Sequence, residues 1–120
     1  MMYRTIAALL MLAASCLAAP AAEMRCGWLE NPTPGNWWLT DRDGSWTLAT
    51  QGDDYRDEVM DKVPPFDEAQ YVATNGNYGY GCACLSVDVD KVETRIVRVH
   101  SGKTIPLTKC EADKTLKRVE

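Results

Sequence analysis

The sequence predicts a small α+β domain dominated by antiparallel strands, with a short C-terminal helix and two disulfides. Three observations predict this class. Four cysteines follow an N-terminal export pattern, two pairs of β-prone segments flank glycine-containing turns, and a helix-capping motif lies near the C-terminus. We expect a signal peptide over residues 1–22 and a single disulfide-stapled domain over residues 23–120, a length typical of one domain.

The first 22 residues have the three parts of a secretory signal. Arg4 supplies positive charge, an uncharged apolar run extends to Leu17, and small residues precede the first acid, Glu23. This run is too short to cross a bilayer core of roughly 30 Å. The pattern predicts a periplasmic or secreted protein with no transmembrane segment in its mature chain.

The cleavage position is left open by the sequence. Cutting after Ala21 or after Ala22 fits the rule of small residues at the cleavage site. Ala13-Ala14-Ser15-Cys16 also resembles a lipobox, so a lipoprotein attached through Cys16 is a minority alternative.

The mature cysteines are Cys26, Cys82, Cys84 and Cys110, and their even number in a short exported chain indicates two disulfides. Cys82 and Cys84 are two residues apart, so on a strand their side chains project in parallel. We therefore expect each to pair with one of the two terminal cysteines, and both connectivities remain open. A zinc site is the alternative. Its ligands usually have wider spacing and His100 is the single histidine, so we predict no metal and no cofactor.

Two hairpins are indicated by turn residues between aromatic and β-branched runs. The first joins Trp37–Thr40 to Ser45–Thr50 across Asp41–Gly44, and the second joins Tyr71–Thr74 to Tyr78–Val87 across Asn75–Asn77. Asp41-x-Asp43-Gly44 also resembles the start of a calcium loop, but the later acidic ligands of that loop are missing, which favours an ordinary turn.

The remaining segments are assigned by their patterns. The acid-rich stretch Asp53–Asp61 predicts a surface excursion with one or two helical turns. Val92–Val99 alternates as a third strand, and Ser101–Lys103 predicts a turn. Thr108–Glu111 matches a capping box, so we expect a terminal helix that frays towards Lys117-Arg118.

Aromatic residues provide the candidate binding surface, which consists of Trp37, Trp38, Tyr78 and Tyr80. Tryptophan and tyrosine anchor many interfaces and can stack on sugars. Because neighbouring residues on a strand face opposite ways, one of the two adjacent tryptophans can be exposed. We expect Trp28 and Trp46 in the core, since the chain has a single phenylalanine.

No catalytic residue is predicted, and the chain is not expected to be an enzyme. His100 and Ser101 are adjacent, and adjacent side chains on an extended strand point apart. After removal of the signal with Arg4, 12 basic and 17 acidic residues give a net charge of −5, which argues against nucleic acid as a partner. An envelope protein or a glycan remains a candidate partner.

The mature chain resembles a bacterial family known as domain of unknown function 4087. The strings that carry the resemblance are Arg25–Leu39, Asp41–Trp46, Gly79–Leu85 and Pro106–Asp113. The resemblance implies a small exported protein of Gram-negative bacteria and transfers no activity to any residue. We predict a non-catalytic binding or inhibitor-like module. The alternatives are a small cell-envelope hydrolase using carboxylates, or a purely structural envelope protein.

Overall fold

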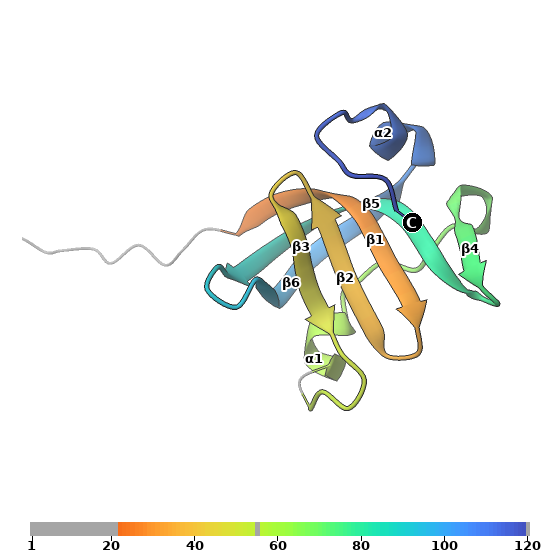
Figure 1. Ribbon diagram of the computed structural model, residues 1–120. Helices are drawn as coiled ribbons and strands as arrows, with labels where there is room; N and C mark the ends of the chain where they lie inside the picture. The colour runs from red at the N-terminus through yellow and green to blue at the C-terminus, as the bar shows by residue number, and fades with distance from the viewer. Residues whose placement is uncertain (1–21, 55, 120) are drawn as a thin grey trace, which may run out of the picture.

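The computed structural model describes residues 22–54 and 56–119, so the expected signal peptide lies outside the described residues except for Ala22. The elements are β1 (Glu23–Thr33), β2 (Asn36–Asp41), β3 (Gly44–Ala49), α1 (Arg56–Met60), the 3-10 turn η1 (Glu68–Gln70), β4 (Val72–Asn75), β5 (Tyr78–Asp90), β6 (Arg95–Ile105) and α2 (Leu107–Ala112). The described part is therefore mainly β-structure, and the expected C-terminal helix is short (Figure 1).

The strands form a closed ring rather than an open sheet. Their order is β1-β2-β3-β6-β5, and β1 also pairs with β5, which closes the ring. The β3–β6 pairing is parallel and the others are antiparallel, while the short β4 adds to the outer edge of β5. Helix α1 follows β3 and packs against β3 and β6 (Figure 1). This is the five-stranded Greek-key barrel architecture of OB-folds.

Both predicted hairpins are confirmed. β2 and β3 pair around the Asp41–Gly44 turn, and β4 and β5 pair around a turn in which Gly76 has φ +59°. Glycine adopts this positive φ without steric cost. The acid-rich stretch also contains its expected helical turn, α1, of which Val59 is buried.

The turn predicted at Ser101–Lys103 is wrong, because these residues continue strand β6. They pair with β5 in the register Ser86↔Ser101, Leu85↔Gly102 and Cys84↔Lys103. A register shift beside Ser86 accommodates His100, so the strand bends here without ending. The ladder to β5, the preceding strand along the chain, outweighs the local turn preference. The chain turns between Asp90 and Arg95, where β5 ends and β6 begins, and not at Ser101–Lys103.

The capping box predicted at Thr108–Glu111 is also wrong. Helix α2 begins at Leu107 with Pro106 as its N-cap, and no side chain of the cap residue bonds the helix. Instead, the Leu107 N–H donates to Oε1 of Gln70 at 2.8 Å, so a distant residue satisfies this helix end. The helix ends at Ala112, where the Asp113 carboxylate accepts hydrogen bonds from the backbone and hydroxyl of Thr115.

Two apolar clusters pack on opposite sides of the barrel wall. The interior cluster contains Leu29, Leu39, Trp46, Leu48, Val59, Ala83, Leu85, Val87, Ile96 and Val99. The exterior cluster contains Trp28, Cys82 and Cys110, with Tyr80, Leu116 and Val119 against them. Trp28 and Trp46 are both buried, as expected. Gly27 lets β1 approach β2 closely, because a Cβ there would lie 2.1 Å from the Thr40 carbonyl oxygen.

The disulfides are Cys26–Cys84 and Cys82–Cys110. The expectation that Cys82 and Cys84 each pair with a terminal cysteine is confirmed. Cys26 and Cys84 lie directly opposite each other on β1 and β5, with their Cα atoms 4.0 Å apart, and Cys82 ties β5 to α2. Two disulfides fit an oxidising extracellular environment. Within the described residues, no helix is long and apolar enough to cross a membrane.

Candidate binding face on the barrel exterior

Trp37 and Trp38 point to opposite sides of β2. Trp37 packs against the interior cluster and stacks on Phe66, with ring centroids 5.5 Å apart and planes inclined by 12°. Trp38 lines a groove on the exterior. Because one ring contributes to the core and the other to the outer surface, the two tryptophans of the candidate surface do not act together.

Strand register brings Trp38, Glu30 and Tyr80 into one row on the barrel exterior. Glu30 on β1 lies opposite Trp38 on β2 and opposite Tyr80 on β5. In antiparallel pairs, directly opposite residues project to the same face and contact each other. A carboxyl group therefore lies between two aromatic side chains from segments far apart in the sequence. We call Trp38, Glu30 and Tyr80 the aromatic row.

Trp28 belongs to a second row of residues, which lies beside the aromatic row and contacts it. Trp28 lies opposite Thr40 on β2 and opposite Cys82 on β5. Its ring meets Tyr80 edge-on, with centroids 5.2 Å apart and planes at 87°. This edge-to-face geometry is favourable for aromatic pairs and holds the Tyr80 ring in place. Tyr78 lies two residues before Tyr80 and is half-buried on the same side of β5.

Hydrogen bonds connect Glu30 to hydroxyl groups on β2 and β3. The Thr40 hydroxyl donates to Oε2 of Glu30 at 2.5 Å, and Thr40 Oγ1 lies 2.8 Å from Ser45 Oγ. Because the single Thr40 proton is committed to Glu30, Ser45 is the donor in the second bond. A line of polar groups from Glu30 through Thr40 to Ser45 therefore crosses three strands beside Trp38.

Burial raises the pKa of Glu30 above its ordinary value, because the half-buried position disfavours the charged form. Hydrogen bonds from Thr40 and Trp38 lower that pKa, but they do not cancel the effect of burial. A carboxyl group in this setting opposes folding when it is ionised. Its position between two half-buried aromatic side chains indicates a role other than stability.

Replacing Glu30 with glutamine is expected to change how stability depends on pH. The folded protein holds the Glu30 proton to a higher pH than the unfolded chain. Wild-type stability therefore falls as pH rises from the ordinary value of 4.5 through the raised pKa. The Glu30→Gln variant lacks this loss. Urea unfolding is measured from about pH 3 to about pH 8. The unfolding free energy of the variant should rise relative to that of wild type through this window, and the difference should stay constant above it.

The control for this variant is Glu58→Gln, an exposed carboxyl on α1. It should reproduce the wild-type stability curve. A constant difference between Glu30→Gln and wild type at every pH would contradict the raised pKa.

The aromatic row borders two hollows that share the C-terminal tail. One, of about 510 Å³, is lined by Glu30, Trp38, Thr40, Ser45 and tail residues Lys117, Arg118 and Val119. The other, of about 610 Å³, is lined by Trp28 and Tyr80 and by the same three tail residues. Figure 1 shows the chain after α2 looping back so that its end lies near β1 and β5. Both volumes fall in the range of small-ligand sites.

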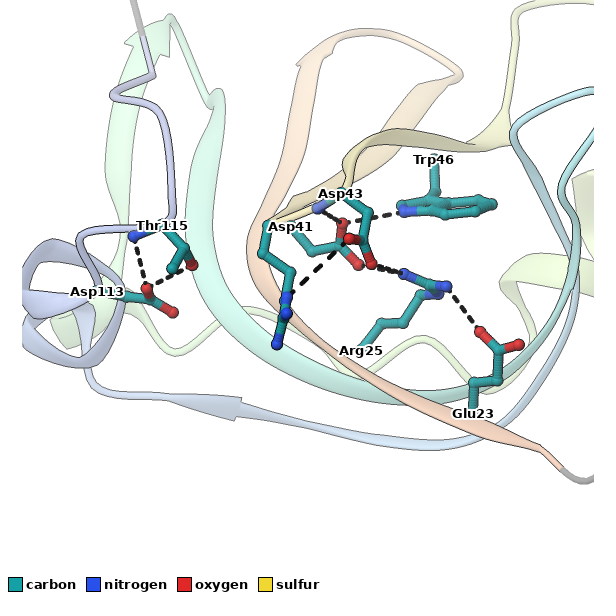
Figure 2. Close-up of polar contacts among 8 residues, drawn as sticks. Glu23, Arg25, Asp41, Asp43, Trp46, Asp113 and Thr115 are labelled. Carbon is teal, nitrogen blue, oxygen red and sulfur yellow. Dashed lines mark hydrogen bonds and ion pairs between the residues drawn. The ribbon is translucent and has the colours of Figure 1, made fainter.

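Arg25 is the centre of a separate polar cluster at the start of β1. Its guanidinium lies 2.7 Å from Asp41, 3.0 Å from Asp43 and 2.7 Å from Glu23, as Figure 2 shows. It also lies over the Trp46 ring, 4.0 Å from the centroid. Burial lowers the pKa of Arg25, but its hydrogen bonds to the three carboxylates outweigh burial and raise it overall.

The same cluster contains Asp41 and Asp43, the two aspartates whose spacing resembles the start of a calcium loop. Asp41 accepts hydrogen bonds from Trp46 Nε1 and from the Asp43 N–H as well as from Arg25, so the protein itself occupies most of its roughly four acceptor sites (Figure 2). This supports the interpretation of Asp41–Gly44 as a turn. Among the described residues, no group of three or more His, Cys, Asp or Glu side chains is arranged to hold a metal.

His100 lies apart from the aromatic row. Its Nε2 lies 3.0 Å from Asp88 on the neighbouring strand, and Ser101 is exposed on β6. Sequence reasoning missed Glu30, Thr40 and Ser45. Their alternation with apolar residues could have placed each on a strand face, but only the register between β1, β2 and β3 shows that the three meet.

Comparison with known proteins finds one family. A model described as a protein of unknown function, DUF4087, matches residues 20–117. No curated protein and no solved structure matches the chain.

Proposed function

The chain belongs to the DUF4087 family of unknown function, and we propose that its domain is the non-catalytic binding module of an exported protein. The observation that carries the proposal is the aromatic row. Trp38 and Tyr80 flank a carboxyl group on the outside of the barrel, beside two hollows of ligand size. Aromatic anchors with a polar group between them are typical of binding surfaces.

Export is supported by two independent features of the chain. Residues 1–22 have the order of a secretory signal, and the two disulfides are suited to an oxidising compartment. A module of this kind would meet its ligand outside the cytoplasm. Envelope proteins and envelope glycans are the available partners there.

The groove chemistry favours binding over carboxylate hydrolysis. Hydrolysis of a glycosidic bond ordinarily needs two carboxyl groups on either side of the bond. Among the described residues, Glu30 is the single carboxyl lining the groove beside Trp38. Its Oε2 accepts a hydrogen bond from the Thr40 hydroxyl. Such an acceptor is suited to recognising a hydroxyl group.

The proposal is tested by retention on envelope baits. The oxidised full-length chain is passed over immobilised envelope extract and, in parallel, over peptidoglycan. We expect at least one bait to retain the chain, and Trp38→Ala to reduce retention about tenfold, as for an anchor residue. The control is Val97→Ala, which removes exposed apolar surface from β6, away from the row. Retention by neither bait, or equal retention of Trp38→Ala and wild type, would contradict the proposal.

A further inference from the structure

We propose that the ligand of this face is a glycan, with one pyranose ring stacked on Trp38 and its hydroxyl groups bound to Glu30 and Ser45. This inference rests on the proposed function and adds its ligand class. It is argued from the side chains of the groove rather than from the family.

A pyranose ring has an apolar C–H face and a polar hydroxyl edge, and the groove offers a partner for each. Trp38 supplies a flat apolar ring, while the line Ser45–Thr40–Glu30 runs directly beside it. Trp38 and Glu30 are register partners on adjacent strands, so their side chains are neighbours on one face. A ring stacked on Trp38 would therefore have its hydroxyl edge over the polar line.

Hydrogen-bonding capacity remains free along that line. An ionised carboxylate has about four acceptor sites. The Thr40 hydroxyl occupies one of those on Glu30, which leaves acceptors for hydroxyl donors of a ligand. Ser45 is exposed and donates its proton to Thr40, so its oxygen can accept from a ligand hydroxyl. Sugar hydroxyls both donate and accept, which matches this mixture.

The second hollow extends the surface for a longer chain of sugars. Tyr80 is at the far end of the aromatic row, is held edge-on by Trp28, and lines that hollow. The same tail residues border both hollows, so the two form neighbouring subsites on one face. An oligosaccharide of several rings could cover both, whereas a single sugar would use one.

Single-stranded nucleic acid is the strongest competitor. OB-type barrels bind both oligonucleotides and oligosaccharides, and bases stack on aromatic rings as sugars do. Lys117 and Arg118 border the groove and could contact phosphate. However, Glu30 places negative charge on the groove floor, and the chain carries a formal net charge of −4. Nucleic-acid affinity depends mainly on neutralising several phosphates. Two basic side chains are few for that purpose, so the acidic net charge of the chain favours an uncharged ligand.

The experiment measures binding of three probes to the oxidised full-length chain by calorimetry and tryptophan fluorescence. The probes are an N-acetylglucosamine tetrasaccharide, cellotetraose and an oligothymidylate. We expect one of the two sugars to bind and the oligothymidylate to bind more weakly. Trp38→Ala should weaken sugar binding about tenfold, and Glu30→Gln should weaken it by a smaller but measurable factor.

Two controls separate the site from general effects. Glu58→Gln removes an exposed carboxyl on α1 and Val97→Ala removes exposed apolar surface on β6, and both should bind sugar as wild type does. Circular dichroism checks that each variant is folded. Glu30→Gln, which we expect to be at least as stable as wild type at neutral pH, keeps the test valid if Trp38→Ala folds poorly.

Three results would overturn the inference. They are binding of neither sugar, tighter binding of the oligothymidylate than of both sugars, and sugar binding unaffected by Trp38→Ala and Glu30→Gln. The first leaves the proposed function in place if an envelope bait still retains the chain through Trp38. Failure of the glycan inference and failure of the proposed function are therefore distinguishable.

Discussion

The Arg25→Ala variant is expected to lose about 3 kcal/mol of unfolding free energy, because it leaves the buried Asp41 carboxylate without its cation. The Asp41 side chain is 3% exposed and that of Arg25 is 10% exposed, so little solvent is available to replace the lost ion pair. The variant also removes the cation from the Trp46 ring. Urea unfolding followed by tryptophan fluorescence measures the loss.

A double-mutant cycle with Asp41→Asn identifies the cause. In that background the buried charge is absent, so Arg25→Ala should cost much less than it does in wild type. Arg42→Ala is the surface control, because its side chain is 76% exposed and lies 4.0 Å from Asp43. It should change stability by less than about 0.5 kcal/mol. An equal cost of Arg25→Ala in both backgrounds would show that the ion pair is not responsible.

Local chemistry explains which features the sequence predicts correctly. Asp41–Gly44 and Asn75–Asn77 form hairpin turns because their residues favour the required backbone conformations and flank β-prone runs. Cys82 and Cys84 are two residues apart on β5, so their side chains project in parallel, which disfavours a bond between them. Each therefore pairs with one of the two terminal cysteines. The partners themselves depend on the β1–β5 pairing, which local patterns do not contain.

Long-range pairing explains the errors. Ser101–Lys103 has turn-forming residues, but each of the three has a register partner on β5, and this pairing extends β6 through them. Thr108 has the spacing of a cap, but Gln70 is close enough to bond the helix one residue earlier. In both places another segment of the chain offers the backbone a better partner than its immediate neighbours do. Closure of the barrel by β1 and β5 has the same origin.

The candidate site depends even more on register. In the sequence, Glu30 is a single acidic residue before Asn31-Pro32, and no local sequence pattern connects it to Trp38 or Tyr80. A shift of one residue in either the β1–β2 or the β1–β5 pairing would turn Glu30 away from its partners. The Cys26–Cys84 bond lies in the β1–β5 ladder and opposes such a shift. The disulfide that the sequence indicates therefore helps to align the row that the sequence does not reveal.

Removing the Cys82–Cys110 disulfide, as Cys82→Ala with Cys110→Ala, is expected to cost about 3.5 kcal/mol in the chain-entropy model. The bond closes a loop with a sequence separation of 28 and connects α2 to the barrel. Cys82 and Cys110 also form the exterior cluster with Trp28, so the substitution removes packing as well. Urea unfolding measures the total loss, and hydrogen exchange of α2 amides measures local release.

The matched comparison is Cys26→Ala with Cys84→Ala, which removes a bond within the β1–β5 ladder. The chain-entropy model assigns this bond about 4 kcal/mol, because its loop is longer. Its removal should leave α2 and the tail protected, whereas removal of Cys82–Cys110 should expose them to exchange and proteolysis. Equal protection of α2 in both variants would show that Leu116 and Val119 alone hold the tail on Trp28.

Release of the tail would also change the two hollows, because both would lose Lys117, Arg118 and Val119 from their linings. Ligand binding should then weaken more in the variant that lacks Cys82–Cys110 than in the variant that lacks Cys26–Cys84.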